Sequence, residues 1–245
     1  MGPTKLATPT EAPPGSLSIE VIRQSLDTEL VGRHMYLFGT VGSTNAVLRR
    51  CADAGARGGT VVLAEEQRNG RGRLGQAWFS PPGVNLYASV LFRPDLPPEA
   101  VPGFSLIASL GLTDAIWAEG LPAAIREPND VLVGGRKVGG TLVECATTAG
   151  HTDYVILGVG ANVNVTPEAL RAGLGVASEG ATSLRAECGR EIDRNVFAAA
   201  FLGFLEKWFE AYRVRGSHAV SAAWRSRLLS PALAAGRGPA GNGYP

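Results

Sequence analysis

Short apolar segments separated by only a few residues constrain the fold of this chain most. Residues 123–126 and 131–133 have strand composition on either side of a break at Pro128-Asn129-Asp130. Gly134-Gly135 then predicts a tight hairpin turn, which returns the chain through Lys137 to Val143. Four further strands are predicted at residues 36–41, 60–64, 85–92 and 154–165. Strands in neighbouring runs, with helices interspersed, predict an α+β fold with a mixed β-sheet flanked by helices.

The predicted helices are separated by these strands. Ser43-Thr44-Asn45 has the composition of a helix start, residues 104–118 form an apolar core helix, and Asp193 begins a long helix with one apolar stripe. A shorter helix follows at residues 217–229. Alternation within residues 85–92 directs one set of side chains to one face, Leu86, Ala88, Val90 and Phe92, and another set to the opposite face, Tyr87, Ser89 and Leu91.

Composition narrows the class of protein. Residues 1–16 and 231–245 are predicted disordered tails around a single domain at 17–230. The apolar fraction of 45% and the net charge of +1 fit a soluble globular protein with no strong field for nucleic acid or membrane. Three widely spaced cysteines predict neither a disulfide framework nor a zinc site, and no metal-ligand cluster is visible. With no secretory signal and no segment long enough to span a membrane, we expect a cytoplasmic protein.

A glycine- and arginine-rich segment, Gly70-Arg71-Gly72-Arg73-Leu74-Gly75, does not suit a hydrophobic core. Glycine resists helix and strand interiors, and arginine carries a fixed charge in a fork suited to carboxylates and phosphates. We therefore expect a loop that closes over an anion. A basic surface turn and a nucleic-acid tether are the alternatives, because such short patterns are common.

One lysine stands out in a chain that uses arginine almost everywhere else. Of its 23 basic residues only Lys5, Lys137 and Lys207 are lysines. Lys137 follows the predicted Gly-Gly turn, so we expect it to supply positive charge to a site. A strand lysine is more often a solvated edge charge, which is the alternative for this residue taken alone.

Five segments together resemble the biotin protein ligase family: Ser43-Thr44-Asn45, residues 67–78 (QRNGRGRLGQAW), Pro128-Asn129-Asp130, residues 137–144 (KVGGTLVE) and residues 158–162 (GVGAN). They occur in the family's order, and the resemblance covers about residues 26–229. It implies a class II-synthetase-like biotin/lipoate ligase catalytic domain that forms biotinyl-5′-AMP from biotin and ATP with Mg²⁺. Biotin then passes to a lysine of a carboxyl carrier domain of a biotin-dependent carboxylase.

The resemblance also implies roles for individual residues. Lys137 would lie between the biotin carboxylate and the α-phosphate, and Asp130 would bind Mg²⁺ or help deprotonate the acceptor lysine; a simple turn cap is the alternative for Asp130. The expected catalytic residues are Lys137, Arg71, Arg73 and Asp130. Biotin would be bound by Ser43, Thr44, Asn45, Gln67, Arg71, Gly72, Arg73, Lys137, Gly139 and Gly140, and the nucleotide by Arg71, Arg73, Trp78, Asn129 and Asn162. Helix capping by Ser43 and Thr44, and a core position for Trp78, are the structural alternatives.

The chain departs from the family pattern in several places. Glu127 stands where the family usually has Trp, and Gln76 where Arg or Lys is common. We see no helix-turn-helix before the core and no C-terminal β-barrel after Ser230, so specific DNA binding is not expected, whereas a homodimer is possible. A lipoate ligase or acyl transferase of the same fold, an impaired enzyme that only binds biotin, and a nucleic-acid binder are the competing functions.

Overall fold

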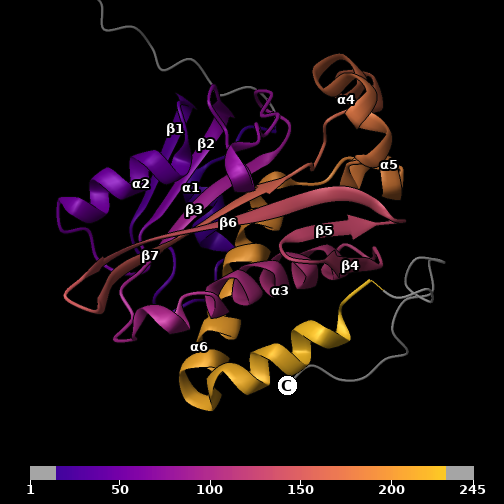
Figure 1. Cartoon of the computed structure of the whole chain (residues 1–245). Coiled ribbons are helices and arrows are strands. Elements are labelled where there is room, and N and C mark those ends of the chain that lie inside the picture. Colours follow the sequence, from indigo (N-terminus) through magenta and orange to yellow (C-terminus); the bar gives the residue numbers. More distant parts are fainter. Residues whose placement is uncertain (1–14, 230–245) are drawn as a thin grey trace, which may run out of the picture.

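The computed structural model describes residues 15–229, which contain one sheet of seven strands (Figure 1). Their order across the sheet is β1-β2-β3-β7-β6-β5-β4. β1 pairs with β2 in parallel and all other neighbours are antiparallel, so the predicted α+β fold with a mixed sheet is confirmed. The strands are β1 Met35–Val41, β2 Val61–Gln67, β3 Leu86–Phe92, β4 Ala123–Arg126, β5 Asp130–Val133, β6 Arg136–Thr148 and β7 His151–Ala161.

The antiparallel half of the sheet follows the predicted turn chemistry. Gly134 and Gly135 have φ of 56° and 78°, the left-handed values that a two-residue hairpin turn between β5 and β6 requires. Lys137 on β6 lies opposite Leu132 on β5. β6 continues beyond the predicted Val143, and a second tight turn leads directly into β7.

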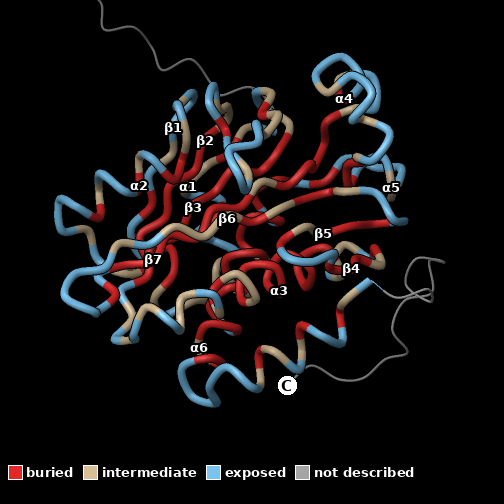
Figure 2. The backbone as a smooth tube through the Cα atoms, in the orientation of Figure 1, coloured by how far each residue is buried: buried red, intermediate tan, exposed pale blue. Residues whose placement is uncertain are grey.

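Helices cover the two faces of the sheet unequally (Figures 1 and 2). α1 Ile19–Gln24, α3 Gly103–Ala118 and α6 Arg194–Ser226 enclose the large hydrophobic core on one face, whereas α2 Thr44–Asp53 covers part of the other face. The alternation predicted in β3 is confirmed, because Leu86, Ala88, Val90 and Phe92 join the large core. On the opposite face Leu91 of β3 packs in a small cluster with Leu48 of α2. The rest of that face is not covered by α2.

The long C-terminal helix also follows its sequence signals. The Asp193 side chain caps its start by accepting from the N–H groups of Asn195 and Val196. The helix breaks at Gly216, where φ is 75°, so its second part begins at the predicted residue 217.

The segment between β7 and α6, for which the sequence predicted no helix, contains short helices. α4 Pro167–Leu174 begins with Thr166 accepting from Ala169 N–H, and a 3-10 turn and α5 Leu184–Cys188 follow. Each of these two α-helices has only one buried residue. A single buried position does not define a helical period, so the sequence gives no apolar pattern for these two helices or for the short α1, whose one buried residue is Ile22.

The segment Pro98–Ala118, which contains α3, is long and apolar enough to cross a membrane by length and composition, contrary to our expectation. However, 61% of its most apolar window is buried inside this fold, as in the core helix of a globular protein.

Of the predicted N-terminal tail, residues 15 and 16 are described: their carbonyl groups accept hydrogen bonds from Arg194 and Asn195. The remainder of that tail and the predicted tail at 231–245 lie outside the described residues.

Candidate active site

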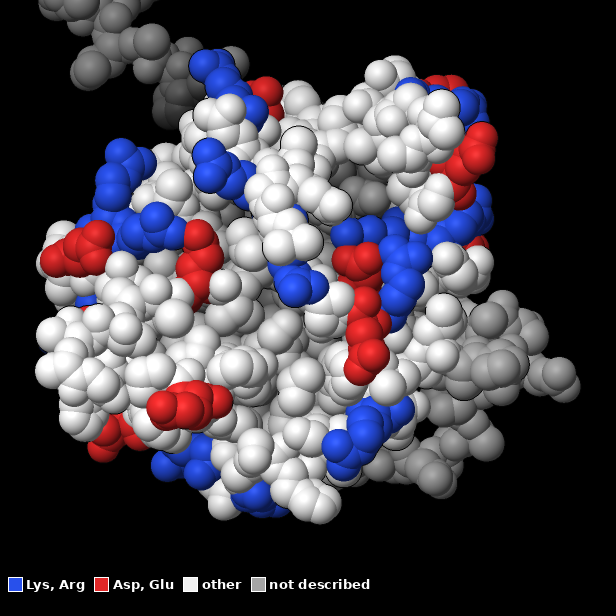
Figure 3. All heavy atoms as spheres, viewed as in Figure 1, with Lys and Arg blue, Asp and Glu red and all other residues white. Residues whose placement is uncertain are grey.

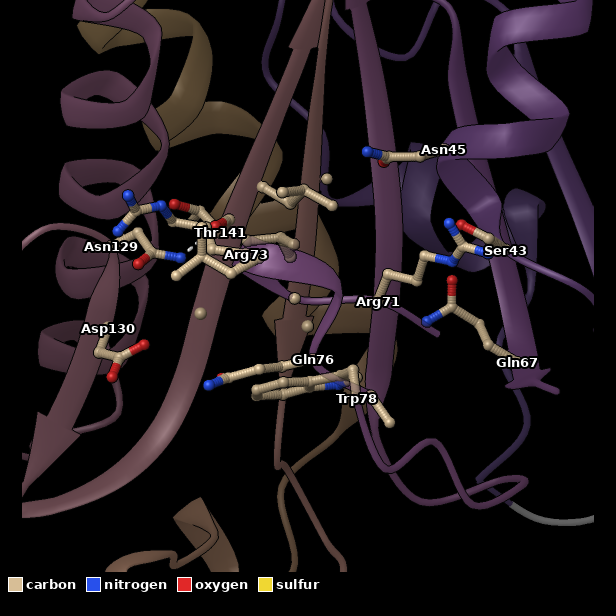
Figure 4. A pocket seen from close by; sticks show the side chains of 18 of the residues that line it. Ser43, Asn45, Gln67, Arg71, Arg73, Gln76, Trp78, Asn129, Asp130 and Thr141 are labelled. Carbon is tan, nitrogen blue, oxygen red and sulfur yellow. Dashed lines mark hydrogen bonds between the residues drawn. The ribbon is translucent and has the colours of Figure 1, made fainter. Parts of the chain in front are cut away.

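A cavity of about 240 Å³ lies on the sheet face that α2 leaves open. Its walls come from the start of α2, the end of β2, the β4–β5 turn and the neighbouring strands β6 and β7, and the segment 71–78 closes it (Figure 4). Most of the predicted site residues line it: Ser43, Thr44, Asn45, Gln67, Arg71, Gly72, Arg73, Trp78, Asn129, Asp130, Lys137 and Gly140. Residues spread over almost 100 positions of the chain are thus brought to one cavity.

Uncharged polar side chains form one end of the cavity. Gln67 Oε1 accepts from the Thr44 backbone N–H at 2.9 Å, so a side chain from the end of β2 caps the start of α2. Ser43 occupies the N-cap position but makes no side-chain capping bond. The capping role considered for Ser43 is therefore wrong, and its hydroxyl remains available to a ligand.

Glycines make room for the cavity floor. On β7 a methyl group on Gly158 would overlap the Asn45 amide, and one on Gly160 would overlap the Trp78 indole. Gly140 pairs with Gly160 across the β6–β7 ladder and lies against both Trp78 and Lys137. Because alternate residues of a strand face the same side, this pattern of glycines lets two large side chains lie directly on the sheet.

The glycine- and arginine-rich segment forms a small hairpin over the cavity. Arg71 and Ala77 form an isolated antiparallel bridge, and Gly72 N–H donates to the Gln76 carbonyl at 2.7 Å. Leu74 at the tip has φ of 56° and is 93% exposed. Figure 4 shows Arg71 extending toward Ser43 and Gln67, while Arg73 points to the side of Asn129 and Thr141.

The hairpin is tied to the sheet where it rejoins β3. Trp78 N–H donates to the Gly70 carbonyl at 2.9 Å, and Ser80 Oγ donates to the Trp78 carbonyl at 3.0 Å. The Tyr87 hydroxyl donates to the Pro81 carbonyl at 2.9 Å. Burial raises the pKa of the Tyr87 phenol well above its usual range, so it remains a neutral donor at all physiological pH values.

Positive charge gathers at the opposite end of the cavity. Lys137 Nζ lies 2.6 Å from Asp130 Oδ1 and 5.2 Å from the centre of the Trp78 ring. The second oxygen of Asp130 is 2.8 Å from Arg126 Nη2. The Trp78 Nε1 atom is buried without a hydrogen-bond partner among the described residues. Lys137 is therefore not a solvated edge charge, because it contacts both Asp130 and the Trp78 ring.

Two predicted site residues do not line the cavity. A methyl group on Gly139 would point to Leu112 of α3, on the other face of the sheet. The Asn162 side chain is buried and donates to the Thr182 carbonyl at 2.9 Å. Of the two departures from the family pattern, Glu127 is exposed at the β4–β5 turn and Gln76 lines the cavity.

Three residues that support the site were not predicted as part of it: Ser89, Glu144 and Arg126. Ser89 contacts the side chains of Thr44 and Asn45, Glu144 contacts that of Asn45, and Arg126 pairs with Asp130. The alternation of β3 already directed Ser89 away from the core, and Glu144 ends one of the matched segments. No signal in the sequence pairs either residue with its distant partner.

Comparisons with known proteins agree with this geometry. The model of the biotin/lipoate A/B protein ligase family matches residues 39–162. The chain is 34% identical over 191 residues to the biotin--[acetyl-CoA-carboxylase] ligase of Paracoccus denitrificans, covering 76% of this chain and 77% of that protein. The biotin protein ligase from Aquifex aeolicus in complex with biotin and ATP has a TM-score of 0.66 at 26% identity, covering 80% of this chain and 79% of that one.

A longer relative is similar over the same region. The bifunctional ligase/repressor BirA of Bacillus subtilis is 34% identical over 217 residues, which cover 88% of this chain but only 66% of that protein. The chain thus spans slightly less than two thirds of the length of this relative.

Proposed function

Because the chain belongs to the biotin/lipoate A/B protein ligase family, we propose that it activates biotin with ATP and transfers it to a protein lysine. The acceptor would be a lysine of the biotin carboxyl carrier domain of a biotin-dependent carboxylase. We also propose that the protein acts in the cytoplasm and that it forms a homodimer.

One observation carries the proposal: a single cavity joins an uncharged hydrogen-bonding end to a cationic end. The ureido ring of biotin has one C=O and two N–H groups, so it requires donors and acceptors together, as Ser43, Thr44 and Gln67 provide. The valeryl carboxylate of biotin would extend toward Lys137. Lipoate has no ureido group, which favours biotin over the lipoate alternative.

In the first step a biotin carboxylate oxygen attacks the α-phosphorus of ATP, and pyrophosphate leaves with the electrons of the broken P–O bond. Two anions approach each other, so fixed positive charge stabilises both the encounter and the transition state. Lys137 would supply this charge, together with Arg71 and Arg73 of the hairpin. Trp78 and Asn129 line the cavity where the nucleotide would lie.

In the second step the amine of the acceptor lysine attacks the acyl carbon, AMP leaves, and the amine loses a proton. Asp130 is the one carboxylate among the described residues that line the cavity, and both of its oxygens already contact cations. This arrangement suits a residue that holds Lys137 and takes a proton better than one that binds a metal. Mg²⁺ would enter bound to the phosphates of ATP and neutralise part of their charge.

Nucleic-acid binding through the hairpin is the competing function, and charge distribution disfavours it. On the face shown in Figure 3, Lys and Arg side chains are intermixed with Asp and Glu and form no continuous basic surface. A nucleic-acid site normally presents such a basic stripe.

Biotin-dependent exchange between ATP and labelled pyrophosphate tests the first step, and transfer of biotin to a purified carrier domain tests the second. We expect both, each dependent on biotin and Mg²⁺. Folded protein that shows neither reaction at saturating biotin would overturn the proposal. Exchange without transfer would leave only the activation step.

A further inference from the structure

A chain of hydrogen bonds on the sheet face beneath α2 leads into the uncharged end of the cavity. Glu144 Oε2 accepts from Asn45 Nδ2 at 2.8 Å. Ser89 Oγ lies 2.6 Å from Asn45 Oδ1 and 2.8 Å from Thr44 Oγ1. Neither Glu144 nor Ser89 lines the cavity, and Ser89 is completely buried. The two residues therefore reach a ligand only through Asn45 and Thr44.

The direction of each bond follows from what each group is able to donate. A carboxylate oxygen only accepts, so Glu144 fixes the Asn45 amide with its nitrogen toward β6 and its oxygen toward Ser89. That amide oxygen also only accepts, so the single Ser89 proton must go to Asn45. The Thr44 hydroxyl, 2.8 Å from Ser89 Oγ and 3.1 Å from the acceptor-only Oε1 of Gln67, must then give its single proton to one of these two oxygens. Thr44 Oγ1 is left with lone pairs only.

Gln67 is held from the other side of Thr44, with its Oε1 also 3.1 Å from the Thr44 hydroxyl. Its Oε1 accepts the Thr44 backbone N–H, a group that only donates, so its Nε2 must point the opposite way. The nitrogen lies 3.3 Å from Ser80 Oγ, which passes its own proton to the Trp78 carbonyl. The Gln67 amide therefore has a second N–H proton for a ligand, beside a Thr44 oxygen that accepts.

The position of Glu144 is itself held. Arg49 on α2 forms an ion pair with its other carboxylate oxygen, which leaves Oε2 for Asn45. Asn45 rests against Gly158, where any side chain would overlap it. The amide thus has little room to take another orientation.

We propose that Glu144 is a positioning residue that sets the hydrogen-bond polarity of this end of the cavity through Asn45 and Ser89. Thr44 is thereby made an acceptor for a ligand N–H, and the site selects a cyclic urea over an isostere that lacks that N–H. This inference rests on the proposed function, because it specifies how that cavity recognises biotin.

Calorimetric titration with biotin, without ATP, tests this proposal. We expect Glu144→Leu to weaken biotin binding about tenfold, the size of one lost ligand hydrogen bond. Glu144→Gln keeps an acceptor oxygen and should stay within about threefold of wild type. Glu66→Leu is the matched control, because the Glu66 carboxylate on β2 accepts from Thr40 and Glu66 does not line the cavity. An unchanged affinity in folded Glu144→Leu would overturn the proposal.

A double-mutant cycle separates the relay from a general structural effect. Thr44→Val removes the acceptor, so Glu144→Leu should cost nothing further in the Thr44→Val background. Effects that simply multiply would overturn the relay.

Ligand selectivity gives a second measurement that a loss of stability would not change. Two cyclic-carbamate analogues of biotin each replace one ureido N–H by oxygen, and wild type should reject at least one of them about tenfold. This rejection should shrink in Glu144→Leu, because an Asn45 amide that is free to turn lets Ser89 donate to Thr44 Oγ1, which leaves the Thr44 proton for Gln67 Oε1 or the ligand. Equal rejection in both proteins would contradict the relay. A wild-type protein that does not bind biotin would overturn the proposed function and this inference together, whereas normal biotin binding with unaltered selectivity would overturn the inference alone.

Discussion

At the α2 end of the cavity the amide and hydroxyl groups of Thr44, Asn45 and Gln67 are all held by protein partners. At the β6 end, by contrast, Arg73 forms no ion pair among the described residues, and the indole N–H of Trp78 has no acceptor there. One end is therefore fixed before a ligand arrives, and the other retains unused charge and hydrogen-bonding capacity.

This difference matches the demands of the two ligands. A small neutral ring is recognised best by groups that cannot reorient, because their ordering cost has already been met in folding. A triphosphate changes its charge distribution during the reaction, so groups that engage late stabilise the transition state more than the ground state. We therefore expect substitutions at the α2 end to change biotin affinity and those at the β6 end to change turnover.

The largest effect is expected from Lys137→Met, which removes the central cation of the β6 end. Biotin-dependent pyrophosphate exchange should fall about 100- to 1,000-fold, the usual loss when one preorganised charged donor is removed. Lys207→Met, on the exposed side of α6, is the control and should exchange normally. Exchange within threefold of wild type in Lys137→Met would show that turnover does not depend on the charge at the β6 end.

Asp130→Asn should separate the two steps of the reaction. It removes the charge that pairs with Lys137 at 2.6 Å and the group that we propose takes a proton from the acceptor amine. Transfer to a carrier domain should fall about 100-fold, within the range for a lost general base, while exchange falls less than about tenfold. Equal losses in the two assays would mean that Asp130 acts only through Lys137. Asp153→Asn, at the β6–β7 turn, is the matched control.

Two glycine substitutions on β7 test whether the two ends of the cavity bind different ligands. Gly158→Ala should displace Asn45 and raise the Kd for biotin about tenfold, whereas Gly160→Ala should displace Trp78 and raise the KM for ATP by a similar factor. Gly203→Ala, where a methyl group meets nothing within 4 Å, is the control. If both variants changed only the Kd for biotin, or only the KM for ATP, the two ends of the cavity would not bind separate ligands.

The smallest effect is expected at the hairpin tip. Asn tolerates the left-handed conformation that Leu74 adopts, and Leu74 is 93% exposed. Leu74→Asn should change the free energy of unfolding by no more than about 0.5 kcal/mol, measured by urea denaturation, and kcat/KM by less than about twofold. A much larger loss of kcat/KM would show that the tip contacts a substrate.

Local chemistry explains which parts of the fold were predictable. The β5–β6 hairpin followed from Gly134-Gly135, and the start of α6 followed from Asp193, because each signal acts within a few residues. α4 and α5 escaped prediction because each has a single buried residue, and no period is defined by one position.

The site residues likewise include some that the sequence singles out and some that it does not. Lys137, Arg71 and Gln67 belong to segments whose composition or family resemblance singled them out, and the structure places all three at one cavity. Glu144 lies 99 residues from its partner Asn45, and Ser89 lies 45 residues from Thr44. Contacts across such separations depend on sheet order, which composition does not specify. The expected cap at Ser43 failed because Gln67, from another strand, occupies that role.

In this account the α2 end binds biotin independently of the charge at the β6 end. Calorimetric measurement of the biotin Kd for Lys137→Met, without ATP, tests it most directly. The claim predicts a Kd within about tenfold of wild type in a protein that has lost exchange. Loss of biotin binding in folded Lys137→Met would contradict it, because one lysine would then govern both ends.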